Sequence, residues 1–309
     1  MKNYRIGILG IGGVGGYLGG KLAAAKLPDA EIIFIARNET KATLKQSGLK
    51  LITDQSEEIA VAQLVSDDPA EIGLLDLLIC AVKGYDLADS LQRYAACLGK
   101  GSVVMPMLNG IGVADRVRAK LPEAQVWESC IYIVARREAW GVIRQSGPVN
   151  QLYFGSPTAA DEDLKKLETL FKRADLKADI VPDIETELWK KFFFISVMAT
   201  FTSYYNAAIG LAQKQPEKAA EIRLLLDELA AVAQAKAINL PAGIVDGTYD
   251  RILSLPPETT SSMYADFQKK GPTELEQLTG EVVQLGKQFG VATTLYNKMY
   301  EGLLNRINQ

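Results

Sequence analysis

A glycine-rich loop near the N-terminus has the residue types and the spacing that bind a dinucleotide. Gly10-Ile11-Gly12-Gly13-Val14-Gly15 matches the pattern GxGxxG, follows the apolar run Tyr4–Leu9 and precedes a predicted helix. In that setting the first glycine permits a tight turn, the second lets the backbone approach a pyrophosphate, and the third lets helix and strand pack closely. The phosphates would lie at the helix N-terminus, where free N–H groups and the helix dipole favour anions. A glycine-rich turn of another α/β fold is the alternative.

The next apolar run, Glu31–Ile35, ends at Ala36-Arg37-Asn38, where the side-chain charge should select between cofactors. An NAD-binding fold usually has an Asp or Glu near this point, which accepts hydrogen bonds from the ribose hydroxyls. A guanidinium instead suits the 2′-phosphate of NADP(H), which a carboxylate would repel. Arg37 therefore favours NADP(H), and a solvent-exposed charge at the strand end is the alternative.

A proton donor has to be found without histidine, because the chain of 309 residues contains none. This absence excludes Ser-His-Asp and Cys-His catalysis, HExxH zinc sites and His-ligated haem. Proton chemistry therefore falls to other groups, such as lysine. Lys191 begins the apolar stretch Phe192–Met198, so partial desolvation should lower the pKa of its ammonium group. A lysine that extends to solvent beside Lys190 is the alternative.

The composition is that of a globular protein. Hydrophobic residues make up 48% of the chain, and a net charge of −3 gives no electrostatic case for nucleic-acid binding. Cys80, Cys97 and Cys130 include no CxxC pair, and we interpret them as buried thiols in a reducing compartment. Glycine interrupts the N-terminal apolar stretch too often for a signal peptide, and Phe192–Phe201 is too short to span a bilayer. We therefore predict a cytoplasmic protein with no metal site and no membrane or nucleic-acid partner.

Alternating strand and helix patterns in the first half must position the glycine loop and the residues that follow later strands. Apolar runs such as Leu75–Val82 and Ser102–Met107 alternate with helical patterns, an order typical of a doubly wound, mainly parallel sheet. Leu75–Val82 is apolar throughout, so both of its faces should be covered. Between Trp127 and Phe154 short extended runs are separated by Gly141 and Gly147-Pro148, and we expect antiparallel strands that close the sheet.

After Pro182 the strand signal nearly disappears and helical patterns take over. The expected helices are Ile184–Asn206, Pro216–Ala237, Pro257–Lys269, Pro272–Phe289 and Thr293–Arg306. The predicted fold is therefore α/β, with a Rossmann-like NADP-binding domain over residues 1–182. A helical domain over residues 183–309 would carry the substrate and catalytic residues.

Five short elements follow the glycine loop in a characteristic order. Val82-Lys83 and Asn109-Gly110 come directly after predicted strands, and Glu187-Leu188-Trp189-Lys190-Lys191, Ser261-Ser262-Met263 and Thr273-Glu274 lie in the helical half. Together with GxGxxG, and over most of the chain, they resemble the ketopantoate reductase (2-dehydropantoate 2-reductase) family. The resemblance implies an NADPH-dependent oxidoreductase. Such enzymes reduce the ketone of 2-dehydropantoate to (R)-pantoate, a step toward pantothenate and coenzyme A.

The resemblance also implies which residues contact the cofactor. The glycine loop, Arg37 and Lys83 would contact NADPH. Asn109 would help to position both the nicotinamide and the catalytic lysine. An ordinary turn is the alternative for Asn109-Gly110, although its place at the carboxyl edge of the sheet favours a functional role.

The remaining roles concern the substrate. By the resemblance, Lys191 would be the general acid at the ketone oxygen, and Ser262 would bind the carboxylate end of the substrate. Glu274 would hold the substrate hydroxyl and orient the site. Acids and serines are also common in the first turn of a helix for capping alone, which is the alternative for Glu274 and Ser262.

Two positions depart from the family pattern. Typical members carry asparagine one and two turns after the catalytic lysine, where this chain has Ile195 and Ala199. Thr202, Ser203 and Asn206 lie further along the chain and could compensate for the two missing asparagines. Of these three we assign Asn206 to the substrate. A pocket that lacks two amide groups would suit a less polar substrate or bind 2-dehydropantoate weakly.

Three readings of function therefore stay open. The first is ketopantoate reductase, the second is an NADPH-dependent reductase of a different 2-oxo acid, and the third is a non-catalytic NADPH-binding regulator. The presence of Lys191, Ser262 and Glu274 argues against a regulator, which would need none of them. Apolar helical domains of this size often pair, so a homodimer is one alternative for the oligomeric state.

Overall fold

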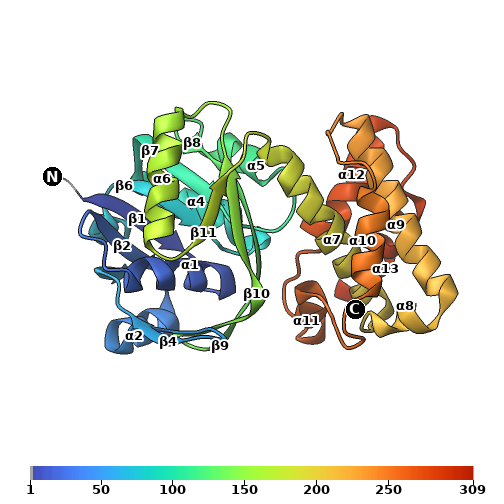
Figure 1. Cartoon of the computed structure of the whole chain (residues 1–309), viewed down its shortest axis with the longest axis horizontal. Helices are drawn as coiled ribbons and strands as arrows, with labels where there is room; N and C mark the ends of the chain where they lie inside the picture. The colour runs from blue at the N-terminus through green and yellow to red at the C-terminus, as the bar shows by residue number, and fades with distance from the viewer. Residues whose placement is uncertain (1–2, 309) are drawn as a thin grey trace. The chain divides into compact units, whose positions relative to one another are not determined.

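The computed structural model describes residues 3–308, which fall into two compact units (Figure 1). The first unit runs to Ile184 but leaves out Asn109–Ile111. The second contains Asn109–Ile111 and the chain from Glu185 onward. Strands occur in the first unit together with helices, whereas the described part of the second is helical. The predicted fold class is therefore confirmed.

The first unit contains a parallel sheet that is covered on both faces. Within residues 3–308 its six strands lie in the order β5 (Leu64–Ser66), β2 (Ala30–Ile35), β1 (Tyr4–Leu9), β6 (Leu75–Cys80), β7 (Leu98–Pro106) and β8 (Gln125–Val126). Leu77 and Ile79 of β6 enter one hydrophobic core, and Leu78 and Cys80 enter another. This alternation confirms that the continuously apolar run marks a strand buried on both sides.

Six α-helices of the described chain belong to this unit. They are α1 (Gly13–Ala24), α2 (Asn38–Ser47), α3 (Pro69–Ile72), α4 (Leu87–Tyr94), α5 (Val113–Lys120) and α6 (Asp161–Arg173). Leu87 and Leu91 of α4 pack in the same core as Leu78 of β6, and Leu164 and Leu167 of α6 pack in the other core. Helices therefore lie on both faces of the parallel sheet, as the doubly wound architecture requires.

The strands between Trp127 and Phe154 do not close the parallel sheet, and that prediction was wrong. They form a second sheet, in which β10 (Val142–Gly155) pairs antiparallel with β9 (Glu128–Ala139). The remaining strands of this sheet are β11 (Lys177–Ile180), β3 (Leu49–Ile52) and β4 (Glu57–Ala60). The alternation of side chains identifies a strand but not its neighbour, and β10 joins β3, which lies about ninety residues earlier in the chain.

Helix α1 lies between the two sheets, and this position explains its many glycines. A Cβ on Gly19 would lie 2.8 Å from the Phe34 ring of the parallel sheet. A Cβ on Gly16 would lie 2.5 Å from the Ile143 side chain of the second sheet. The helix that begins with the glycine loop is therefore in close contact on two sides.

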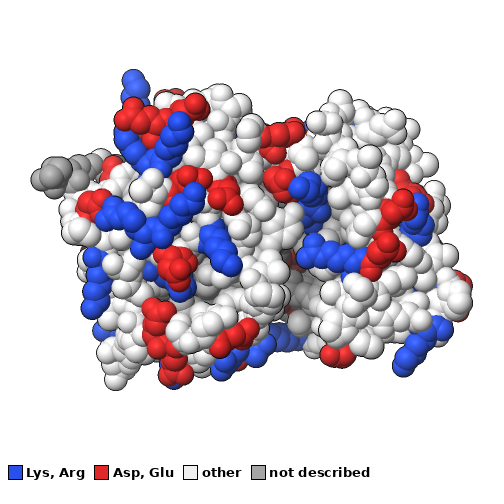
Figure 2. Space-filling model, in the orientation of Figure 1, with Lys and Arg blue, Asp and Glu red and all other residues white. Residues whose placement is uncertain are grey.

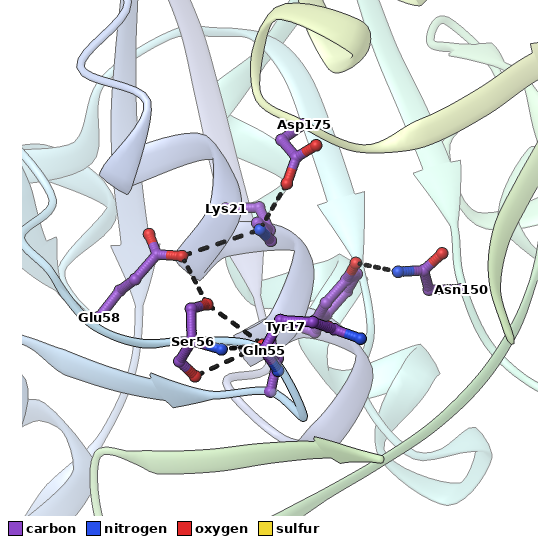
Figure 3. Close-up of polar contacts among 8 residues, drawn as sticks. Tyr17, Lys21, Gln55, Ser56, Glu58, Asn150 and Asp175 are labelled. Atoms are coloured by element: carbon purple, nitrogen blue, oxygen red, sulfur yellow. Dashed lines mark hydrogen bonds and ion pairs between the residues drawn. The ribbon is translucent and has the colours of Figure 1, made fainter. Parts of the chain in front are cut away.

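Polar contacts hold the later turns of α1 (Figure 3). Lys21 Nζ donates to Asp175 at 2.8 Å and lies 3.8 Å from Glu58 Oε1, and the Lys21 side chain is only 12% exposed. One turn earlier, the Tyr17 hydroxyl accepts from Asn150 Nδ2 of β10 at 3.2 Å. A lysine in the last turn also suits the negative end of the helix dipole. These contacts fix the helix whose other end carries the glycine loop.

Many surface charges of the described residues lie beside opposite charges. Figure 2 shows acidic and basic side chains side by side over the face in view. On α6, Lys166 lies 3.2 Å from Glu162, and Arg173 donates two hydrogen bonds of 2.7 Å to Asp29. Such exposed pairs contribute about 0–1 kcal/mol each to stability.

The helical unit contains more helices than the sequence predicted. Its elements within the described residues are α7 (Ile184–Tyr205), α8 (Gly210–Lys214), α9 (Pro216–Ala235), α10 (Ile244–Leu253), α11 (Ser262–Gln268), a π-helical turn (Glu276–Gly280), α12 (Glu281–Phe289) and α13 (Thr294–Ile307). The prediction missed α8 and α10. The expected helix Pro257–Lys269 is shortened to α11, because Pro257 supplies a carbonyl to the Gly210 N–H and Ser261 caps the later start.

The core of the helical unit gathers around α7. Phe192, Phe193, Val197 and Phe201 are fully buried in it, and α9 contributes Leu225, Leu226 and Leu229. The Tyr296 hydroxyl is also buried there and lies 2.8 Å from Ser196 Oγ. None of the helices formed by residues 3–308 combines the length and apolar character that a membrane span requires.

Buried tyrosines should make the fold sensitive to alkaline pH. Burial raises the pKa of Tyr296, and burial together with the charges of Asp76 and Asp163 raises the pKa of Tyr4 to about 12. Since both pKa values lie above the unfolded value of about 10, the associated stability is present below about pH 10 and is lost as the pH rises through the folded values. We expect the free energy of unfolding to fall above about pH 10.

Urea unfolding between pH 8 and 11 measures this loss, with Tyr296→Phe as the comparison. The variant lacks one titrating group, so its stability should fall less steeply than that of the wild type, by up to about 1.4 kcal/mol per pH unit. An identical alkaline slope in both proteins would contradict the assignment to Tyr296.

Candidate cofactor and catalytic sites

The three motif glycines of the first unit have different steric surroundings. Gly10 has a φ of +93°, and a Cβ there would lie 2.9 Å from the backbone of Ala81 and Val82. A Cβ on Gly15 would lie 2.1 Å from the Gly10 carbonyl oxygen. A Cβ on Gly12 would meet no described atom within 4 Å. Gly10 and Gly15 are therefore needed by the fold itself, whereas the open space lies at Gly12.

The other three loop residues can contact a ligand mainly through their backbone. Ile11 is 5% exposed and belongs to the hydrophobic core, and Val14 packs against the same core. A Cβ on Gly13 would lie 2.2 Å from the Ala135 carbonyl oxygen of β9. Gly12 is the N-cap residue of α1, and in the described chain no side chain caps this helix end. Backbone N–H groups at such an end bind phosphate well, so the loop fits a dinucleotide.

The residues that follow three neighbouring strands share one edge of the parallel sheet. Leu9 of β1 pairs with Ile35 of β2 on one side and with Cys80 of β6 on the other. Gly10, Arg37 and Lys83 follow these strand ends within one to three residues. Strand β1 lies where the chain order reverses, between β2 and β6, and ligands of open α/β sheets bind at that point. Arg37 is exposed and takes the N-cap position of α2.

In the helical unit the structure brings Lys191 and Asn109 together. Lys191 Nζ donates a hydrogen bond of 3.1 Å to Asn109 Oδ1, and both residues are partly buried. Asn109 belongs to the short segment that joins this unit, and Ile111 anchors the segment in the helical core with 4% exposure. The alternative in which Lys191 only extends to solvent is inconsistent with this contact. A fixed ammonium group on an apolar helix is a suitable proton donor.

Glu274 lies beside an unusual helical turn. The residue is 2% exposed, and its carbonyl accepts the Leu278 N–H at 3.0 Å at the entrance to the π-helical turn. The same turn contacts the Asn109 segment, because a Cβ on Gly110 would lie 3.2 Å from the Gln277 carbonyl oxygen. The sequence pattern carried no signal for this π-helical turn, which is a feature often found near functional sites.

The remaining predicted residues lie on or near α11. Ser262 is the exposed first residue of α11. Asn206 ends α7 with a φ of +51°, and its Oδ1 accepts a hydrogen bond from Gln268 at the other end of α11. Ile195 is partly buried and Ala199 is 1% exposed. Thr202 Oγ1, which lies between Ala199 and Asn206, is 2.8 Å from Ser261 Oγ, a contact that the sequence did not suggest.

Comparison with known proteins identifies the family of the chain. A family profile described as ketopantoate reductase PanE/ApbA matches residues 6–158, and the profile for the C-terminal part of the same family matches residues 183–306. The chain belongs to the ketopantoate reductase family. Its members are nicotinamide-dependent oxidoreductases that act on a ketone or CH–OH group.

Individual relatives of this ketopantoate reductase family member are distant but cover its full length. The uncharacterized oxidoreductase YkpB of Bacillus subtilis is 25% identical, with 96% of each chain covered. The crystal structure of 2-dehydropantoate 2-reductase from Porphyromonas gingivalis W83 is 31% identical and superposes with a TM-score of 0.85, over 98% of this chain and 100% of the other. A ternary structure of D-mandelate dehydrogenase with NADH and anilino(oxo)acetate shares the fold at 22% identity and a TM-score of 0.87, with 98% of each chain covered.

Proposed function

We propose that this family member is an NADPH-dependent 2-dehydropantoate 2-reductase that forms (R)-pantoate for pantothenate and coenzyme A synthesis. The observation that carries the proposal is the hydrogen bond from Lys191 Nζ to Asn109 Oδ1, which holds an ammonium group at the start of the apolar stretch Phe192–Met198. The 31% identical relative from P. gingivalis, described as 2-dehydropantoate 2-reductase, supports the choice of substrate.

The chemistry requires one proton donor and one hydride donor. When bound, NADPH would supply a hydride to the ketone carbon and would itself become NADP⁺. Negative charge then builds on the ketone oxygen and has to be neutralised. The Lys191 ammonium donates a proton to that oxygen and recovers one from water. The Asn109 amide accepts from Lys191, so it keeps the ammonium oriented while the proton is transferred.

The other predicted residues bind and orient the reactants. Ser262 is exposed and offers a hydroxyl to the substrate carboxylate. Glu274 is almost fully buried, so its carboxylate can hold the substrate hydroxyl in one geometry. Asn206 binds the substrate through its amide, whose Oδ1 also accepts from Gln268. On the cofactor side, Lys83 and the backbone around Gly12 bind the phosphates.

Arg37 gives the protein its preference for NADPH in this proposal. Arg37→Ala should raise the KM for NADPH about 10- to 100-fold, since charge-assisted contacts to a phosphate contribute about 1.5–3 kcal/mol. The KM for NADH should stay nearly unchanged in Arg37→Ala. In the control Lys45→Ala, on the same helix, the KM for NADPH and the KM for NADH should both stay nearly unchanged. Steady-state kinetics with each cofactor measures the difference. Equal losses with NADPH and NADH would contradict the assignment.

A second candidate substrate is a less polar 2-oxo acid, which Ile195 and Ala199 favour because they place no amide in the pocket wall. Following NADPH absorbance with 2-dehydropantoate and a panel of branched and aromatic 2-oxo acids separates the candidates. Turnover of 2-dehydropantoate with the highest kcat/KM supports the main proposal, and a higher value for another acid supports the second. Tight NADPH binding without turnover of any acid would indicate a regulator. The homodimer and the cytoplasmic location stay predictions from the sequence.

A further inference from the structure

Helix α11, which carries Ser262, is too short to be stable without contacts to the rest of the unit. It has seven residues, whereas isolated helices shorter than about 12 residues are marginal in water. Non-helical chain flanks it on both sides, over residues 254–261 and 269–274. Met263 is its one fully buried side chain in the described structure. Phe267 packs against the same core as Met263, and polar contacts at both ends of α11 add to this packing.

The start of α11 is bonded to α7, the helix that carries Lys191, and the end of α11 is bonded to the residue that follows α7. At the start of α11, Ser261 Oγ lies 2.8 Å from Thr202 Oγ1 of α7. At its end, Gln268 Nε2 donates to Asn206 Oδ1. Thr202 lies in the last turn of α7, three residues after Ala199, and so continues the row of Lys191, Ile195 and Ala199 at helical spacing. Asn206 is the residue that follows α7 and has a φ of +51°.

The hydrogen bonds at Thr202 have a defined direction. Thr202 Oγ1 donates to the Met198 carbonyl at 2.6 Å, which uses its only proton. Ser261 must therefore be the donor in its contact with Thr202. Ser261 Oγ in turn accepts the Tyr264 N–H of α11 at 3.0 Å, as the N-cap of that helix. The result is a relay from the first turn of α11 through two hydroxyls to the backbone of α7.

We infer that Thr202 is a positioning residue: through Ser261 it fixes the first turn of α11 and with it the substrate-binding hydroxyl of Ser262. Thr202 is fully buried, so it acts through Ser261 and not by touching the substrate. The inference rests on the proposed function, because that function assigns Ser262 to the substrate carboxylate. It also explains why this α7 carries a hydroxyl where α11 docks.

Thr202→Val tests this role, since valine keeps the shape but neither accepts from Ser261 nor donates to Met198. We expect the KM for 2-dehydropantoate to rise about tenfold, which corresponds to about 1.4 kcal/mol of lost binding. The kcat and the dissociation constant for NADPH should change less than about threefold. Thr202→Ser, which keeps the hydroxyl, should restore the wild-type KM. An unchanged KM in Thr202→Val, or a Thr202→Ser variant as impaired as Thr202→Val, would overturn the inference.

Hydrogen–deuterium exchange gives a readout that needs no substrate. In Thr202→Val the peptide covering residues 262–269 should exchange faster than in the wild type, while peptides of α9 and α12 stay unchanged. Gln268→Met, at the exposed end of α11, should also accelerate exchange in this peptide without any risk to the core. Should the wild type fail to reduce 2-dehydropantoate, the proposed function fails, and the exchange experiment still decides the inference. No change in exchange in Thr202→Val would overturn it.

Discussion

Lys191→Ala is expected to lower kcat for reduction of the 2-oxo acid by about 10²- to 10⁴-fold, the range that a positioned general acid contributes. The ammonium is the group that can protonate the ketone oxygen in this proposal, and alanine leaves that oxygen without a donor. The KM for NADPH should change little, because Lys191 is not among the predicted contacts of the cofactor, which are the glycine loop, Arg37, Lys83 and Asn109. Stopped-flow measurement of a single turnover checks the effect on the chemical step.

Lys190→Ala is the matched control for this prediction. Lys190 is the adjacent residue of α7, but its ammonium forms an ion pair of 2.6 Å with Glu187 and is 36% exposed. Its removal should leave kcat within about threefold of the wild type, since an exposed ion pair contributes about 0–1 kcal/mol. Asn109→Ala should fall between the two lysine variants, because it removes the orienting acceptor and keeps the proton. Equal activity of Lys191→Ala and Lys190→Ala would refute the role of Lys191.

The parts of the fold that the sequence predicted are those set by local patterns. The parallel strands could be recognised because residues such as Leu77 and Leu78 are both apolar, which indicates burial on two faces. The partner of β10 could not be recognised, because β3 is distant in the sequence and the side-chain pattern of a strand does not identify its neighbour. Helix α10 was missed because its pattern includes Gly247 and ends in a segment rich in proline.

The candidate site shows the same division. The glycine loop is predictable because a short local pattern marks it, and the structure shows a steric need for glycine at Gly10 and Gly15. The contact between Lys191 and Asn109 joins residues that are 82 positions apart, and only the resemblance to a family suggested it. The relay through Thr202 and Ser261 depends on the direction of two hydroxyl protons, which no sequence pattern encodes. Long-range polar contacts therefore determine which side chains meet in the candidate site, and composition and periodicity do not predict these contacts.

Gly12→Ala and Gly15→Ala should impair different properties, although both replace a motif glycine by alanine. Gly12→Ala should weaken NADPH binding, and Gly15→Ala should lower the stability of the fold. Gly12 has extended backbone dihedrals and open space, so alanine there should change the free energy of unfolding of the cofactor-free protein by less than about 1 kcal/mol. It should weaken NADPH binding at least about tenfold, since the methyl group fills the space through which a pyrophosphate approaches the backbone. Gly15→Ala should destabilise the cofactor-free protein by about 1–3 kcal/mol or more, because its Cβ would lie 2.1 Å from the Gly10 carbonyl oxygen.

Urea unfolding without cofactor and fluorescence titration with NADPH measure the two effects separately. The two variants differ only in whether the methyl group is added at Gly12 or at Gly15. If Gly12→Ala loses NADPH binding and keeps wild-type stability, the pyrophosphate lies at Gly12. A Gly12→Ala variant that binds NADPH as tightly as the wild type would place the phosphates elsewhere. A Gly15→Ala variant as stable as the wild type would show that strand and helix can separate there, which the close contact with Gly10 opposes.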